Sequence, residues 1–98
     1  MYVSIRRYKL ASDKSFDELN RRVKESFLPI LQKLSGLKQY YTVDTGKGEV
    51  LSVSLWDSKD SAEKATMEAR NWVAQSASDL VPDAPEAIAG VTGVEFRG

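Results

Sequence analysis

The stretch from Glu49 to Trp56 alternates two kinds of side chain with a period of two, which is typical of a β-strand. One side of such a strand receives aliphatic residues only, at Leu51, Val53 and Leu55. The other side receives small hydroxyl groups closed by an indole, at Val50, Ser52, Ser54 and Trp56. We predict that this strand lies at the centre of a sheet, with its aliphatic side packed against helices of the same chain.

Three further segments alternate in the same way and are rich in β-branched and aromatic residues. We predict strands from Tyr2 to Lys9, from Leu37 to Asp44 and from Ala87 to Arg97. The Gly-rich turn from Thr45 to Gly48 joins the second of these strands to the one that begins at Glu49, which predicts an antiparallel hairpin.

A first helix is predicted from Ser15 to about Leu34, because apolar residues recur there at spacings of three and four. Ser15 and Glu18 have the spacing of a capping box, which marks the helix start. Pro29 is expected to kink this helix, because proline has no N–H group to donate to the Glu25 carbonyl.

A second helix is predicted to begin at Ser58 or Asp60 and to end near Ser78. Its inward side is mostly alanine, so it can approach the sheet closely. The segment from Val81 to Pro85 cannot continue a helix, and we expect it to cover one end of a pocket.

The order strand, helix, strand, strand, helix, strand predicts a ferredoxin-like α+β fold. In this fold a four-stranded antiparallel sheet carries two helices on one face, and right-handed crossovers place the first and third strands at the centre. The 98 residues suffice for one domain, residues 1–98, with a single core. The predicted core face of the sheet consists of Val3, Ile5, Tyr41, Val43, Leu51, Val53, Leu55, Val94 and Phe96.

Composition excludes several kinds of chemistry. The chain has no cysteine and no histidine, which removes thiolates and imidazoles as nucleophiles, bases and metal or haem ligands. Its 14 basic and 14 acidic residues cancel, so no overall charge favours nucleic acid or an anionic membrane. We therefore expect no metal, no cofactor, no nucleic acid and no membrane partner. Without a visible membrane span or signal peptide, a cytoplasmic location is expected.

The opposite face of the predicted sheet mixes aromatic rings with hydroxyl and charged groups. Its members are Tyr2, Ser4, Arg6, Tyr8, Tyr40, Thr42, Val50, Ser52, Ser54, Trp56, Glu95 and Arg97. This mixture is too aromatic for an ordinary hydrated face and too polar for a second apolar core. We expect this face to meet another subunit, to line a ligand cavity, or both.

Several segments resemble the antibiotic biosynthesis monooxygenase-like family of dimeric α+β barrels. Leu34 to Tyr41 is similar to the family's Pro-Gly-Phe-x-x-Tyr motif at the start of the second strand, and Leu55 to Ser58 is similar to its strand-ending tryptophan. Asn71 to Val73, with Pro85 to Gly90, is similar to its C-terminal half. The resemblance implies a homodimer formed through the open sheet faces, and a small aromatic ligand in a pocket between sheet and helices.

The same resemblance implies a cofactor-independent monooxygenase that holds a small aromatic or phenolic compound while it reacts with dioxygen. Members of the family use polar and aromatic pocket residues, among them Asn, Trp, Tyr and Arg. The candidate pocket residues of this chain are Arg6, Tyr8, Tyr40, Ser52, Ser54, Trp56, Asn71 and Trp72. Relatives that degrade haem use a histidine ligand, which this chain lacks.

The tryptophans and the asparagine among these candidates also have structural interpretations. Trp72 follows Ala65 and Ala69 at helical spacing, which favours a core position over a catalytic one. Asn71 can face either solvent or the pocket. Trp56 lies on the predicted pocket side, either as a pocket residue or as a plug in a dimer interface.

The polar candidates are likewise open to two interpretations. Arg6 can hold a carboxylate or phenolate, but an ion pair with Glu95 on the same face is favoured, because inward charges are usually paired. Tyr8 and Tyr40 are expected to be wall residues first and hydrogen-bond donors second. The serines are not expected to be nucleophiles, because no base is available to activate them.

Three classes of function remain at this point. The first is the cofactor-free oxygenase, and the second is a non-catalytic dimer that binds a small molecule or stabilises an assembly. The third is an RNA-recognition module, in which aromatic residues on the open sheet face stack on bases. It fits poorly, because the segment from Val50 to Asp57 lacks the mixed basic and aromatic signature of such modules.

Overall fold

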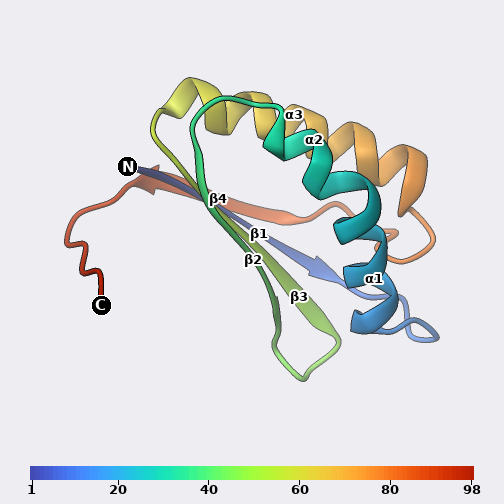
Figure 1. The fold of residues 1–98 in the computed structure, drawn as a ribbon. Coiled ribbons are helices and arrows are strands. Elements are labelled where there is room, and N and C mark those ends of the chain that lie inside the picture. The colour runs from blue at the N-terminus through green and yellow to red at the C-terminus, as the bar shows by residue number, and fades with distance from the viewer.

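The computed structural model describes residues 1–98 and contains four strands and two helical regions (Figure 1). The elements in chain order are β1 (Tyr2–Lys9), α1 (Phe16–Arg22), the π-helical segment η1 (Val23–Phe27), α2 (Leu28–Gln32), β2 (Leu37–Asp44), β3 (Glu49–Trp56), α3 (Lys59–Ser76) and β4 (Glu86–Val91). The strands form one antiparallel sheet in the order β2-β3-β1-β4, and the helices lie together on one face of it (Figure 1). The predicted ferredoxin-like α+β fold and the central position of the first and third strands are confirmed.

The two central strands pair along their whole length. In this register Tyr2 lies opposite Trp56, Arg6 opposite Ser52, and Lys9 opposite Glu49. Side chains directly opposite each other in an antiparallel pair point to the same face of the sheet. The register therefore gathers the polar and aromatic rows of β1 and β3 on a single face.

The predicted direction of the two faces is wrong. The burial of β3 alternates, with Val50, Ser52, Ser54 and Trp56 buried under the helices and Leu51, Val53 and Leu55 only partly covered on the open side. The aliphatic row of β1 is likewise on the open face. Alternation divides a strand into two sets of residues, but it does not say which set the chain's own helices cover.

The helix that begins after Ser15 contains a π-helical segment in place of the predicted simple kink. The Leu28 amide bonds to the Val23 carbonyl, five residues earlier, and Pro29 then falls in the first turn of α2, where no N–H donor is needed. Both buried residues of the π-helical segment, Val23 and Phe27, face the sheet. The irregularity accommodates the proline and keeps these two side chains in the interior.

The first helix is tied to the end of α3 by a charged network. Ser15 accepts a bond from the Glu18 amide at 3.2 Å, as the capping box predicts, but the Glu18 carboxylate turns to Arg21 and Arg22 instead of returning to Ser15. Arg22 also donates to both carboxylate oxygens of Asp79, at 2.7 and 3.0 Å. The arginines lower the pKa of both carboxyl groups. This network fixes the turn that leads from α3 to β4.

The opposite end of the helical layer depends on a glycine. Gly36 adopts a φ of 92°, in the left-handed region, and its carbonyl accepts a bond from the Asp57 amide at 2.9 Å. A side chain at this position would collide with the Asp57 carboxylate. Gly36 thus follows the first helical region closely after its predicted end at about Leu34. The N-cap of α3 is Ser58, which accepts a bond from the Ser61 amide.

The last strand is shorter than predicted. It ends at Val91, and Val94 and Phe96 are 100% and 90% exposed in a tail that runs away from the sheet (Figure 1). The tail therefore contributes nothing to the core. Glu95, which was expected to share a face with Arg6, lies 3.7 Å from the N-terminal ammonium group instead.

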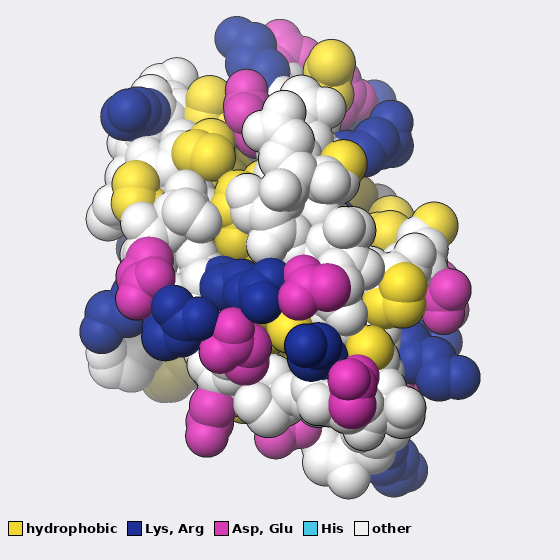
Figure 2. Space-filling view, turned by 90° about the vertical axis from the view of Figure 1, so that its right-hand side faces the viewer, with side chains coloured by type: hydrophobic (Ala, Val, Ile, Leu, Met, Phe, Trp, Pro, Cys, Tyr) yellow, Lys and Arg dark blue, Asp and Glu magenta, His cyan; other side chains and the backbone are white.

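The surface carries charges of both signs. Figure 2 shows them interspersed at the end of the molecule that holds α1, with only small apolar areas between them. The open face of the sheet differs, because it presents a row of partly or largely exposed apolar side chains at Val3, Ile5, Tyr41, Val43, Leu51, Val53, Leu55 and Ile88. None of the helices combines the length and the apolar character that a membrane crossing requires.

Trp56 is fully buried, so its truncation tests the observed direction of the faces. We expect Trp56→Ala to lower the free energy of unfolding by about 3–5 kcal/mol, because it leaves a large cavity under α2 and α3. Urea denaturation followed by circular dichroism measures this loss. Met67→Ala, at a side chain that is 65% exposed, should change stability by less than about 0.5 kcal/mol. A loss below about 1 kcal/mol for Trp56→Ala would contradict the observed packing.

Candidate functional site

Two cavities lie between the sheet and the helices, and they share Arg6, Tyr8, Val73 and Val81. The inner cavity has a volume of about 30 Å³ and is also lined by Leu19, Val23, Phe27, Tyr40, Thr42, Val50, Ser52, Ala69 and Trp72. The outer cavity has a volume of about 390 Å³ and is also lined by Thr66, Arg70, Ala74, Ser78, Pro82, Asp83, Ala84, Pro85 and Ala87. The shared residues make the two cavities one candidate site with a narrow inner end and a wide outer end.

The outer cavity opens between α3 and β4. Ala87 and Ala89 occupy the helix-facing positions of β4 next to Arg6 and Ser4, and both remain exposed. Their methyl groups are too small to fill the space beside α3. The segment from Val81 to Pro85 forms another wall of this cavity, at the place predicted for it.

Arg6 is the only charged residue that lines both cavities. Its side chain is buried, with the residue 3% exposed, and its one hydrogen bond is a long one, from Nη2 to the Ser52 hydroxyl at 3.4 Å. The Nε and Nη1 groups have no partner, and none of the ion pairs in the structure includes Arg6. The expected pair with Glu95 does not form. A buried cation without a counter-charge is rare, because its removal from water is costly.

Tyr40 joins Arg6 through a short chain of hydroxyl groups. The Ser52 hydroxyl accepts from Arg6 and donates to the Tyr40 oxygen at 3.1 Å, which leaves the Tyr40 proton free for another acceptor. Burial raises the pKa of Tyr40, although the bond from Ser52 and the charge of Arg6 act in the opposite direction. Tyr40 is therefore a neutral phenol at physiological pH that can donate a hydrogen bond.

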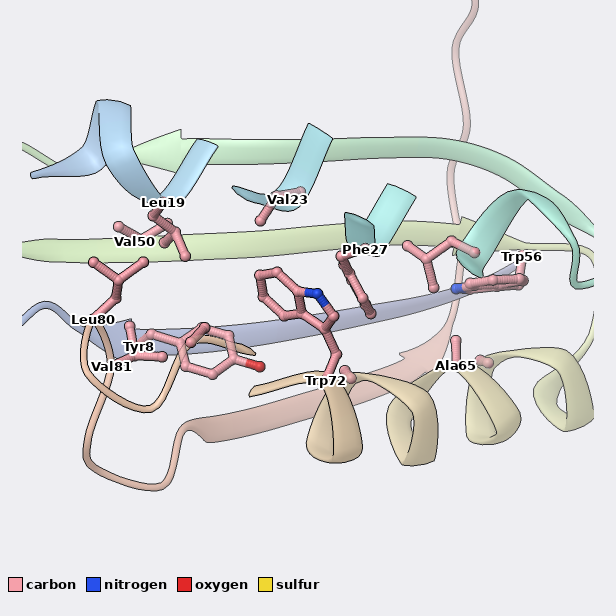
Figure 3. Packing of buried hydrophobic residues seen from close by; sticks show 14 residues of the cluster. Tyr8, Leu19, Val23, Phe27, Val50, Trp56, Ala65, Trp72, Leu80 and Val81 are labelled. Carbon is pink, nitrogen blue, oxygen red and sulfur yellow. The ribbon is translucent and has the colours of Figure 1, made fainter. Parts of the chain in front are cut away.

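Trp72 is both a core residue and a wall of the inner cavity. Its ring nitrogen donates to the Ser26 hydroxyl at 2.8 Å, and its ring lies 5.1 Å from that of Phe27 (Figure 3). Phe27 in turn meets the edge of the Tyr40 ring at 6.1 Å. These contacts hold a set of aromatic rings in fixed positions around the cavity.

Three of the eight candidate residues line neither cavity. Trp56 is completely buried at the far end of the core, near Ala65 (Figure 3). Ser54 is buried beside it with no partner for its hydroxyl group, and Asn71 is exposed on the outer side of α3. Trp56 fills the core instead of the expected pocket or interface position, whereas Trp72 occupies its expected core position and also borders the inner cavity. Arg6, Tyr8, Tyr40, Ser52 and Trp72 are brought together.

Sequence reasoning missed several wall residues. Thr42 lines the inner cavity and donates to the Asn20 side-chain oxygen at 2.6 Å. Val23 and Phe27 belong to the apolar residues that recur along the first predicted helix, but their spacing of four gave no sign that they border a cavity. The sequence did contain a signal for Thr42. It lies two residues after Tyr40 in the same strand, so the two side chains point to the same face of the sheet.

The aromatic residues of this face are not available for RNA binding on an open sheet. Tyr8 and Trp56 are buried, and Tyr40 is partly buried under Phe27. The open face itself presents mainly aliphatic side chains. RNA-recognition modules stack bases on exposed aromatic rings of the sheet, and the aromatic rings of this face are not exposed in that way.

The sheet order, the single helical layer and the cavity between them define a ferredoxin-like α+β protein with the fold of antibiotic biosynthesis monooxygenases. No family model matches the sequence, and no curated protein matches it. The monooxygenase ActVA-Orf6 of Streptomyces coelicolor, solved with the ligand Nanaomycin D, is similar in structure, with a TM-score of 0.77, 12% identity, and coverage of 99% of this chain and 91% of that chain.

Two other solved structures are similar to this chain. A protein assigned as an antibiotic biosynthesis monooxygenase from Chloroflexus aurantiacus has a TM-score of 0.70 and 18% identity, over 99% of this chain and 96% of that chain. A dimeric ferredoxin-like protein from an uncultured marine organism has a TM-score of 0.73 and 14% identity, over 99% of this chain and 98% of that chain. At sequence identities of 12–18%, the structural similarity to these three proteins establishes the fold of this chain.

The raised pKa of Tyr40 predicts a pH-dependent loss of stability. The folded protein favours the neutral phenol, so this contribution is complete below the unfolded pKa, about 10, and is lost as pH rises through the folded pKa. Urea midpoints measured from pH 8 to pH 11 should therefore fall more steeply for the wild type than for Tyr40→Phe. Tyr41→Phe, at the exposed neighbouring tyrosine, should follow the wild type. Parallel curves for the wild type and Tyr40→Phe would contradict the burial of this phenol.

Proposed function

We propose that this chain is a cofactor-independent monooxygenase that oxidises a small aromatic or phenolic compound in the cavity between sheet and helices. The observation that carries the proposal is the chain of bonds from Arg6 through Ser52 to Tyr40 beside an otherwise largely apolar inner cavity. The outer cavity, at about 390 Å³, is large enough for an aromatic ring, and the polar chain at its inner end suits the oxygen atom attached to that ring. The shared fold with a monooxygenase adds support.

The overall reaction balances without any further reactant. A phenol and dioxygen give a quinone and water, one oxygen atom going to the ring and the other to water. The substrate supplies all four electrons that dioxygen accepts, so no side chain has to be oxidised or reduced. The phenolic proton and one ring hydrogen end in the water molecule.

The protein's contribution in this proposal is to bind the substrate and to stabilise negative charge. Tyr40 donates a hydrogen bond to the substrate oxygen, and the charge of Arg6 favours the anion that forms when the phenol loses its proton. Tyr8, Val73 and Val81, which line both cavities, hold the ring in place. The apolar walls of the inner cavity keep bulk water away from the substrate oxygen.

The oxidation can be tested with 1-naphthol as the phenol. We expect the protein to consume dioxygen and to form 1,4-naphthoquinone, with one labelled atom in the quinone when the reaction runs under ¹⁸O₂. Tyr40→Phe should lower kcat/KM by about tenfold to a hundredfold, because it removes one donor to a developing oxyanion. Tyr41→Phe is the matched control and should react like the wild type. Absence of ¹⁸O in the product of this and related phenols would favour a non-catalytic binding module.

We also propose that the chain forms a homodimer through the open face of its sheet. The apolar row on this face is a continuous surface that the chain's own helices leave uncovered. At its border Arg7 pairs with Glu49 and Glu86 within the same chain, so these three charges are compensated before a second copy binds. One similar structure is described as a dimeric ferredoxin-like protein, which supports this arrangement.

Val53 lies at the middle of this row, opposite Ile5 and Tyr41. The wild type is expected to elute in light-scattering chromatography at twice the chain mass of 10.9 kDa. Val53→Asp should raise the dimer dissociation constant about a hundredfold or more, because it places an unpaired carboxylate in an apolar interface. Met67→Asp, on the exposed side of α3, should leave the dimer intact. A wild-type monomer at high concentration would refute the dimer.

A further inference from the structure

We propose that the ligand of this cavity carries a carboxylate group on a small ring, and that Arg6 binds this carboxylate where the two cavities meet. The inference deepens the proposed function, because it takes the same cavity as the substrate site and names the chemical class of the substrate. It rests on the sizes of the two cavities, on the unpartnered groups of Arg6 and on the charges around the outer opening.

The cavity volumes decide how such a ligand is oriented. The inner cavity, at about 30 Å³, holds one or two water molecules, so a carboxylate's oxygen atoms fit there and a ring does not. The outer cavity, at about 390 Å³, is within the range of small-molecule sites. The ring therefore belongs between Val73, Val81 and the proline-rich segment, with its polar end directed inward to Arg6.

Arg6 lacks the partner that a ligand carboxylate would supply. Its only bond is to Ser52, and its Nε and Nη1 groups are unpaired in the interior. Glu49 and Glu86 pair with Arg7 on the opposite face of the sheet, so neither compensates the charge of Arg6. Bonds between a guanidinium and a carboxylate are among the strongest in proteins, so a bound carboxylate would replace the missing solvation.

The charges at the outer opening also favour an anion. Arg70 lines the outer cavity and forms no ion pair, and Asp83 is the only acidic residue that lines it. With Arg6 this makes two positive groups against one negative group. Thr66 and Ser78 add hydroxyl groups at the same cavity. Arg70 is exposed, so its effect should be modest and should weaken with salt.

Benzoate and benzamide provide the test, because they have nearly the same shape and differ in charge. Binding to the full chain is measured by isothermal titration calorimetry, with amide NMR shifts to place the ligand. The wild type should bind benzoate about tenfold or more tightly than benzamide. Equal affinities for the two compounds, or benzoate shifts that avoid the residues of the two cavities, would overturn the proposal.

Arg6→Met separates ligand binding from a structural role. Methionine replaces a buried, unpaired charge by an apolar chain of similar length, so the variant should be at least as stable as the wild type toward urea. Its affinity for benzoate should fall about tenfold or more, while its affinity for benzamide changes less than about twofold. Arg7→Met alters the adjacent arginine on the other face and should leave benzoate binding unchanged. Retained preference for benzoate in Arg6→Met would refute the assignment.

These measurements need no turnover, so they can be told apart from a failure of the proposed oxidation. Benzoate binding that depends on Arg6, without dioxygen consumption by any phenol, would support this inference and refute the monooxygenase. Oxidation of 1-naphthol by a protein that binds benzoate no better than benzamide would do the reverse.

Discussion

The close approach of α3 to the sheet is the constraint on which the rest of the structure depends. Ala62, Ala65 and Ala69 are buried on this helix, and the central strands below it present small serine side chains. Two layers with such small residues can lie near each other, and a few rings then fill the remaining space. Trp56 fills one end of the layer completely, whereas Trp72 and Phe27 fill the middle only in part. The cavity is the volume left where the rings end.

This arrangement also explains how a guanidinium can occupy the interior. The same small-residue layer that admits α3 supplies hydroxyl groups, and Ser52 gives Arg6 its one bond. That bond compensates only partly for the water that Arg6 has lost, so a destabilising charge remains in the interior. Burial of the apolar and aromatic side chains of the core offsets this cost. Destabilised groups of this kind concentrate at functional sites because the function requires them.

Much of the fold could be predicted from the sequence, because its signals are local. Alternation located the first three strands and the beginning of the fourth, and the glycine turn located the hairpin. Ser15 marked the first helix start, and Ser58 was one of two candidates for the second. The direction of the sheet faces could not be predicted in this way. Apolar residues are normally assigned to the chain's own core, and this rule fails when an apolar row remains open on the other side. This error placed Trp56 in a pocket or an interface, although it lies in the core.

The candidate site was predicted less completely than the fold, for a physical reason. Arg6, Tyr8, Tyr40 and Ser52 share one face because strand register is regular, so their proximity follows from the pattern. The cavity itself exists because the side chains of Ala87 and Ala89 are small and because the Val81–Pro85 segment forms one of its walls. Neither leaves a periodic signal. The π-helical segment, which keeps Val23 and Phe27 in the interior, also arises from tertiary packing around Pro29.

The two faces of the sheet divide the proposed tasks between them. Arg6 and Arg7 are adjacent in β1, yet Arg6 lies in the cavity and Arg7 binds Glu49 and Glu86 on the open face. The proposed dimer would cover the open face and leave the outer cavity accessible, because that cavity opens at the side, between α3 and β4. Pairing of two sheets would restrain the central strands from behind and so hold Arg6 and Ser52 in position. A second copy would then stabilise the site without contributing a residue to it.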